Sequence, residues 1–251
     1  MTDTADPPSP PASEETPVEF HKPKPVHNWR EFFKEYAIIV LGVLTALAAE
    51  QTVEWLHWQG EVRAARQALA GEISANGGYF ARRLAIAPCI HKQFQEAEAI
   101  LSALEAGRPP PTFTVFRPGA GSLLVDGEWQ SQRASQTLTH FPREELATMS
   151  RYYAQLPEIS YWVRSEMESW AQLGLLKNPP AGLGPSDLAR LRSILGLVER
   201  YGALVDLNAH RMLVVGETMK IAPQPLDHAR IELFCTGSDA EYNDYLQTIS
   251  R

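Results

Sequence analysis

The residues with the clearest capacity for chemistry are aromatic side chains with polar atoms, grouped with arginines between residues 129 and 170. Rings that carry a hydroxyl or an indole N–H can line a ligand pocket between helices, and a nearby guanidinium can receive an anionic ligand. The alternative is that these side chains pack in a core and hydrogen-bond their polar atoms locally. The pattern predicts a candidate ligand pocket made by Trp129, Arg133, Tyr152, Tyr153, Trp162 and Trp170.

Two cysteines, Cys89 and Cys235, offer a second kind of chemistry. In an oxidising compartment they could form a disulfide that closes a long loop and contributes about 4–5 kcal/mol in the chain-entropy model. The alternative is two separate buried thiols, each behaving as a small apolar residue. The sequence leaves both interpretations open.

Catalytic and metal-binding motifs are missing from the sequence. It contains no H-E-x-x-H, G-x-S-x-G or C-x-x-C motif, and no glycine-rich loop that ends in Lys-Ser/Thr. The nearest approach to a metal pair is Cys89 with His91, which lacks further ligands at zinc spacing. We therefore name no catalytic, cofactor-binding or metal-ligating residue. We expect a non-enzymatic protein, with an unrecognised hydrolase or transferase as the alternative.

The element that dominates the sequence is a long uncharged run at residues 36–49. Fourteen helical residues span only about 21 Å, but Tyr36 and Trp55 are 19 residues apart, or about 28 Å along a helix. Aromatic rings prefer the two interfaces of a bilayer whose hydrocarbon core is about 30 Å thick. The pattern predicts a transmembrane helix with aromatic flanks at residues 28–58.

Two alternatives to a retained transmembrane helix remain. Ala46-Leu47-Ala48 resembles the cleavage site of a signal peptide, and the run has the length of an apolar signal core. The other alternative is a buried helix of a soluble protein. If the helix lies in lipid, its small residues allow close approach of another helix, and a carboxylate nearby can pair with a partner or reach interfacial water. The expected helix-packing residues are Gly42, Ala46, Ala49 and Glu50.

Charge gives the expected topology and excludes one class of partner. Four basic residues precede the apolar run, and two follow it within 20 residues of Trp58. By the positive-inside rule the N-terminus is cytoplasmic and the larger C-terminal part is exported. Residues 59–251 contain 19 basic and 21 acidic residues, so no basic surface is available for nucleic acid.

The remaining chain is predicted to be all-α. Residues 1–27 are rich in proline and acidic groups and are expected to be a disordered tail. Residues 59–251 have helical spacing and predict an antiparallel bundle that continues from the membrane helix, with helix ends at Pro88 and Pro157. The segment 112–125 breaks the pattern and predicts a small β-hairpin or an irregular loop.

The clearest helical pattern outside the membrane runs from about Ser186 to Met219. Its apolar residues alternate at spacings of three and four, and Gly202, Ala209 and Gly216 are seven residues apart on one side. A face of small residues allows another backbone to approach closely. We expect this face to pack within the bundle, with contact between two chains as the alternative.

The segment Trp29–Gln51, with Trp129, Ala134-Ser135 and Arg151-Tyr152-Tyr153, resembles a group of uncharacterised bacterial single-pass membrane proteins. In that group a short apolar helix leads into a helical extracytoplasmic domain. The resemblance implies a bacterial inner-membrane location with a periplasmic C-terminal domain. It implies no catalytic residue, because the group has no assigned activity.

These observations lead to one main hypothesis and one binding alternative. The main hypothesis is a membrane-anchored envelope protein that serves as a protein-interaction or structural module, with membrane lipid around its anchor and itself or another envelope protein as partner. The binding alternative is a ligand-sensing helical bundle that acts through a partner.

Overall fold

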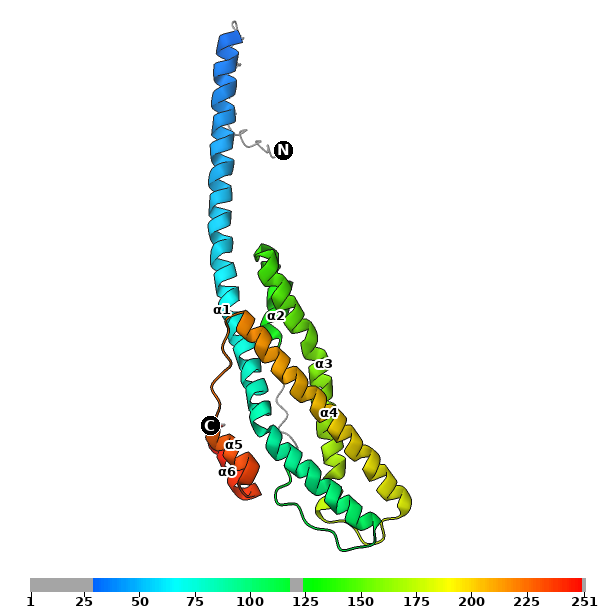
Figure 1. Ribbon diagram of the computed structural model, residues 1–251. Coiled ribbons are helices and arrows are strands. Elements are labelled where there is room, and N and C mark those ends of the chain that lie inside the picture. The colour runs from blue at the N-terminus through cyan, green and yellow to red at the C-terminus, as the bar shows by residue number, and fades with distance from the viewer. Residues whose placement is uncertain (1–28, 118–123, 250–251) are drawn as a thin grey trace, which may run out of the picture. The chain divides into compact units, whose positions relative to one another are not determined.

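The secondary structure of the described chain consists of helices joined by irregular segments, and in this computed structural model the described residues are 29–117 and 124–249. No strand occurs in these residues, so the all-α prediction is confirmed. The tail expected at 1–27 lies outside them, as does the middle of 112–125, whose described parts are irregular. The helices are α1 (Trp29–Glu105), α2 (Gly127–Ala134), α3 (Arg143–Leu173), α4 (Pro185–Thr218), α5 (His228–Thr236) and α6 (Asp239–Ile249), with short 3-10 turns at Thr137–His140 and Gly174–Lys177 (Figure 1).

The first of two compact units is residues 1–54, and its described part belongs to α1. The large apolar side chains between Ile38 and Val53 are exposed, except that of Val40, which is partly covered. Near the N-terminus α1 is long and apolar enough to cross a membrane, and none of that apolar stretch is covered by the rest of the protein. This exposure favours the predicted transmembrane helix over a helix buried within the chain.

The second unit, residues 55–251, is a bundle of α1, α3 and α4. Apolar residues 62–80 of α1 share one core with residues 149–163 of α3, and residues 86–101 of α1 share a second core with the end of α3. The two helices are thus parallel, while α4 enters the second core first and runs antiparallel to both (Figure 1).

The small-residue face of α4 packs inside the bundle. Ala209 is fully buried, Gly202 lies against the side chains of Arg83 and Glu166, and Gly216 lies against the carbonyl oxygen of Ile221. A β-carbon added at Gly202 would lie 3.2 Å from Glu166 Oε1. Packing within one chain therefore occupies this face, as we expected.

Two prolines lie inside long helices, so the predicted helix ends were wrong. Pro88 is within α1 and Pro157 is within α3. Each proline removes one backbone donor and crowds the preceding turn. However, Ile86 and Ile90 around Pro88, and Leu156 and Ile159 around Pro157, are buried on both sides of the break. Continuing the helix keeps all four side chains in the core, and this burial outweighs the local cost.

A close backbone crossing joins α1 to the segment that follows α4. The backbone N–H of Gln224 donates to the carbonyl oxygen of Ser74 at 2.9 Å, and Ser74 Oγ donates to the carbonyl oxygen of Ala222 at 2.7 Å. β-carbons added at Gly77 and Gly78 would lie 3.1 Å from Pro223 and 2.9 Å from the β-carbon of Gln224. Glycine at these two helical positions therefore permits the crossing.

We expect Gly78→Ala to lower the free energy of unfolding by about 1–3 kcal/mol, because the added methyl group overpacks against the Gln224 backbone and β-carbon. The matched control is Gly71→Ala, also in α1, where an added β-carbon meets nothing within 4 Å. Alanine has the higher helix propensity, so this control should stabilise the protein by about 0.5–1 kcal/mol. Thermal unfolding followed by circular dichroism measures both. Equal effects of the two substitutions would contradict the crossing argument.

Candidate functional site

The six residues predicted to form a pocket do not come together in one place. Trp129, Tyr152 and Tyr153 are buried in the first core, where the rings of Trp129 and Tyr153 stack at 4.7 Å. Trp170 is fully buried in the second core. Trp162 is half-buried against the first core, and Arg133 is exposed on α2. The structure thus places these aromatic side chains as packing groups.

Buried polar side chains of α1 hold α2 beside these aromatic rings. Asn76 exchanges two hydrogen bonds with the backbone of Val125, at 2.8 and 2.9 Å. The carboxylate of Glu72 accepts the backbone N–H groups of Glu128 and Trp129 at the start of α2. Unpaired N–H groups at a helix start favour such an acceptor. These contacts fix the position of the Trp129 ring.

A charged layer, in which Arg83 and Glu166 are buried and Asp206 is 37% exposed, separates the two apolar cores. Arg83 of α1 donates to Glu166 of α3 at 2.9 Å and to Asp206 of α4 at 2.6 Å. Burial opposes the charged form of Arg83, but the charges and hydrogen bonds of both carboxylates outweigh it and raise the pKa of Arg83. Burial also raises the pKa of Glu166, against the opposing effect of Arg83. The two ion pairs of Arg83 thus connect α1 to both α3 and α4.

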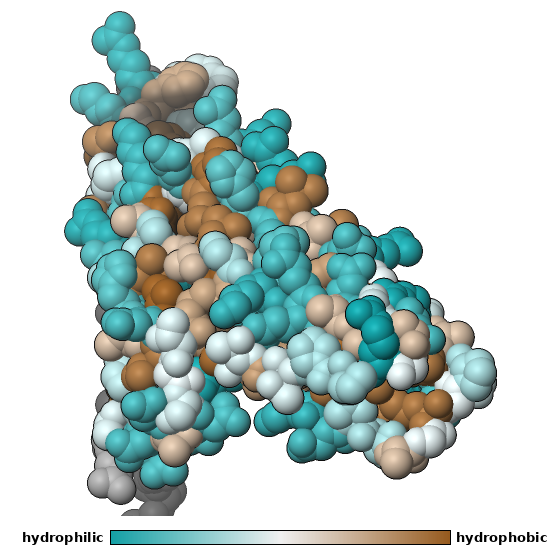
Figure 2. Space-filling model, turned by 60° about the horizontal axis from the view of Figure 1, so that its bottom comes forward, coloured by the Kyte–Doolittle hydropathy of each residue, from teal (hydrophilic) through white to brown (hydrophobic). Residues whose placement is uncertain are grey.

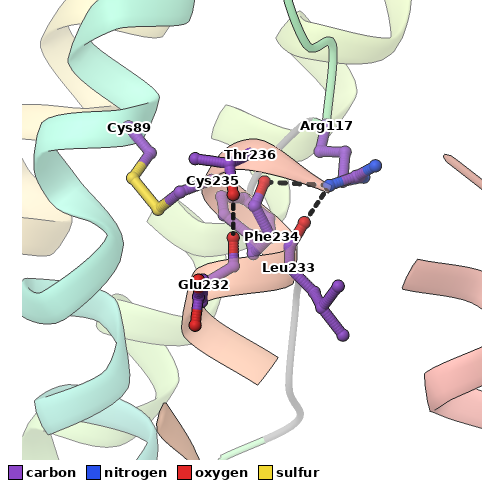
Figure 3. The surroundings of a disulfide bond; sticks show 7 residues. All are labelled: Cys89, Arg117, Glu232, Leu233, Phe234, Cys235 and Thr236. Atoms are coloured by element: carbon purple, nitrogen blue, oxygen red, sulfur yellow. Dashed lines mark hydrogen bonds between the residues drawn. A yellow bond between two sulfur atoms is a disulfide. The ribbon is translucent and has the colours of Figure 1, made fainter. Parts of the chain in front are cut away.

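The two cysteines are joined in a disulfide that connects α1 to α5 (Figure 3). The side chain of Arg117 lies nearby and donates to the carbonyl oxygens of Leu233 and Phe234 near the end of α5. It also donates to the Gly237 carbonyl oxygen at 2.6 Å. A guanidinium here supplies donors to carbonyl oxygens at the end of the helix, although that of Leu233 also accepts the backbone N–H of Gly237. The disulfide and Arg117 together fasten the C-terminal helices to the bundle.

A polar cavity of about 340 Å³ lies beside the glycine crossing, and we refer to it as the arginine pocket. Arg82 and Tyr79 from α1 line it, together with Arg230 from α5. The opposite wall is the segment from Gln224 to Asp227. The arginine pocket is thus built where the crossing brings residues from two distant parts of the chain together.

The expected helix-packing face of the apolar segment is uncovered. Gly42, Ala46, Ala49 and Glu50 are all exposed, and a β-carbon added at Gly42 would meet nothing within 4 Å. On the face of the molecule shown in Figure 2, by contrast with the apolar segment, hydrophobic residues are interspersed among hydrophilic ones. Association through the small-residue face stays a prediction.

Comparison of this chain with known protein families, with curated proteins and with solved structures finds no match. The resemblance to bacterial single-pass membrane proteins therefore stays a prediction from the sequence. The structure supports its coarser content, which is one apolar N-terminal helix followed by a helical domain.

Sequence reasoning missed the arginine pocket. Arg82 and Arg230 are 148 residues apart, and neither belongs to a recognisable motif. One signal was present in the sequence, the pair Gly77-Gly78. Two adjacent glycines within a strongly apolar helical pattern also indicate a close approach of another backbone.

Proposed function

We propose that this chain is a bacterial inner-membrane protein with one transmembrane helix, whose helical domain lies in the periplasm and acts by binding a protein partner. The resemblance of residues 29–51 to the anchors of bacterial single-pass membrane proteins supports this proposal. So does the excess of basic residues before the apolar segment, which favours a cytoplasmic N-terminus.

The observation that carries the proposed compartment is the disulfide between Cys89 and Cys235. Disulfides persist in the bacterial periplasm, whereas the reducing cytoplasm keeps most thiols free. The bridge lies in the unit that follows the uncovered apolar helix. A domain that keeps a structural disulfide is best accounted for on the oxidising side of the membrane.

The proposed mode of action rests on the uncovered face of the anchor. Helices in lipid associate largely through packing, and small residues let two backbones approach closely. Gly42, Ala46 and Ala49 provide such a face, and Glu50 follows it with an exposed carboxylate. The partner is a second transmembrane helix, either from another copy of this chain or from another envelope protein.

Protease added to intact spheroplasts is expected to degrade residues 55–251 while the membrane remains sealed. Protein from these cells should not react with a thiol-specific reagent until its disulfide has been reduced. A non-reducing gel shows this as the absence of a mobility shift before reduction. Retention of the chain in the supernatant after detergent-free high-speed centrifugation would refute the anchor. A domain that resists protease until the membrane is opened would refute the periplasmic location.

We expect Ala46→Leu to reduce cross-linking of the anchor to its partner helix severalfold, because the larger side chain keeps the two backbones apart. Cross-linking is measured in native membranes from a photoreactive residue placed at Val53, which lies on the same helical face as Ala46. Ala48→Leu makes the same chemical change on another side of the helix and should leave the product unchanged. Equal yields from both variants would argue against association through this face.

A further inference from the structure

The bundle begins close to the point where the apolar segment of α1 ends. Leu56 is the last large apolar side chain of α1 that is exposed, and Val62 is the first residue of α1 that is buried in a core. Both belong to one continuous helix. The six-residue step between them spans about 9 Å. The core of the bundle therefore starts within two helical turns of the apolar segment.

This step is comparable with the thickness of a lipid headgroup layer. The hydrocarbon core of a bilayer is about 30 Å thick and the whole bilayer about 40–45 Å, which leaves about 5–7 Å for each headgroup layer. In the proposed anchor Trp55 marks the exported interface, because tryptophan rings prefer that position. Any part of the bundle that packs against the residues just after Trp55 is consequently at the level of the headgroups.

The segment that packs there is the connection between α2 and α3. We refer to residues 136–143 as the α2–α3 turn. The ring of His140 in this turn stacks on the ring of Trp58, with centroids 3.7 Å apart and planes 15° apart. Trp58 is three residues after Trp55, which is about 4.5 Å along the helix. The α2–α3 turn thus lies beside the part of α1 that leaves the interface.

Further contacts fix the α2–α3 turn in this position. Leu138 and Phe141 are buried in the first core. The guanidinium of Arg66 lies 5.5 Å from the centre of the Phe141 ring, and it donates two hydrogen bonds to Glu145, at 2.7 and 2.9 Å. Moving the turn away from α1 would break these contacts, so the turn is a rigid part of the bundle.

The outer side of the α2–α3 turn is polar and carries a cation. Its exposed residues are Gln136, Thr139, His140, Pro142 and Arg143. The Arg143 side chain has no ion pair with any residue in 29–117 or 124–249. A guanidinium binds phosphate oxygens well, and an imidazole N–H next to it supplies another donor. This surface suits the phosphate layer of a membrane and does not suit its acyl chains.

We propose that the α2–α3 turn is a second membrane-contact site, at which Arg143 and His140 bind the phosphate groups of phospholipid headgroups. The inference rests on the proposed anchor and adds the lipid surface as a partner of the helical domain. A single helix in a bilayer is free to tilt over a wide range of angles. A turn that is fixed to the bundle and bound to headgroups restricts that tilt and thereby orients the domain over the membrane.

A fluorescent probe on an added cysteine, in the full chain reconstituted into lipid nanodiscs, tests this proposal. The two natural cysteines are joined in the disulfide, so the added cysteine is the only free thiol. Thr139→Cys places the probe on the α2–α3 turn, and Asn178→Cys places it on an exposed residue beyond the other end of α3. A nitroxide on the lipid headgroup should quench the probe at position 139 severalfold more than the probe at 178.

Charge reversal tests the role of Arg143. In the chain that carries Thr139→Cys, Arg143→Glu should lower the quenching about twofold or more, because attraction to lipid phosphate becomes repulsion. The matched control is Arg190→Glu, the same change at an exposed residue near the start of α4, and it should leave the quenching unchanged. Nanodiscs of phosphatidylcholine and phosphatidylglycerol serve for all variants.

A third probe position separates failure of this proposal from failure of the anchor. Val53→Cys places the probe on an exposed residue of the anchor close to Trp55. Quenching at position 53 without quenching at 139 would overturn the second contact and leave the anchor intact. Quenching at neither position would overturn both. Equal losses from Arg143→Glu and Arg190→Glu would overturn the assignment of phosphate binding to Arg143.

Discussion

Replacing both Cys89 and Cys235 by serine is expected to lower the free energy of unfolding by about 5 kcal/mol. The bridge joins residues separated by 146 positions, so it removes a large loop entropy from the unfolded chain. It also holds α5 against α1, where Phe234 is buried in the second core. Urea unfolding of the full chain in detergent, followed by circular dichroism, measures the change.

Reductant provides the control for this prediction. The natural chain treated with dithiothreitol should unfold at the same urea concentration as the double serine variant, and the variant itself should not respond to reductant. Loss of the bridge should also increase proteolysis within residues 228–249, since α5 and α6 keep only their non-covalent contacts. A variant whose unfolding free energy stays within about 1 kcal/mol of the oxidised protein would contradict the prediction.

Arg83→Met is expected to lower the free energy of unfolding by about 3–5 kcal/mol at pH 8. Methionine fills similar space, but it leaves Glu166 buried without its cation. The side chains of Arg83 and Glu166 are only 5% and 4% exposed, so water cannot replace the lost partner. Removing one member of a buried pair costs far more than the pair itself contributes, because an uncompensated charge remains.

The loss caused by Arg83→Met should be smaller at pH 5 than at pH 8. Burial already raises the pKa of Glu166, and removing the Arg83 charge raises it further. Between the ordinary glutamate pKa, about 4.3, and this raised value, the folded variant binds more protons than the unfolded chain. Lowering the pH through that interval therefore stabilises the folded variant, because protonation removes the uncompensated charge.

An exposed ion pair provides the comparison for Arg83. Arg66 pairs with Glu145 at 2.7 Å, but these side chains are 45% and 28% exposed. Arg66→Met should therefore cost only about 0–1 kcal/mol, with little dependence on pH between 5 and 8. Similar losses from the two arginine substitutions would show that burial of the charged layer has no special effect.

The sequence was sufficient to predict helices wherever one face of the pattern was apolar. The long C-terminal pattern predicted α4, and its small-residue face packs within the bundle as expected. The predicted breaks at Pro88 and Pro157 failed because proline rules consider one helix alone. Whether a helix continues through proline depends on whether the residues before and after the proline are buried against other helices. That burial is a property of the tertiary packing.

Hydrogen bonds and ion pairs between side chains were harder to predict from the sequence than apolar packing. Glu72 and Arg83 lie within the helical pattern of α1, but only the fold shows that one caps α2 and the other binds two carboxylates. The arginine pocket depends on Arg82 and Arg230 lining one cavity beside the glycine crossing. Spacing along the sequence carries no information about a contact over 148 residues.

The separation of the two cysteines also determines when the disulfide can form during synthesis of the chain. At about 5–20 residues per second, a ribosome adds Cys89 about 7–30 s before it adds Cys235, 146 residues later. During that interval Cys89 can pair only with a cysteine of another molecule, because the sequence contains no third cysteine. Oxidation within one molecule consequently marks a nascent polypeptide whose synthesis has passed α5, and premature oxidation yields covalent dimers.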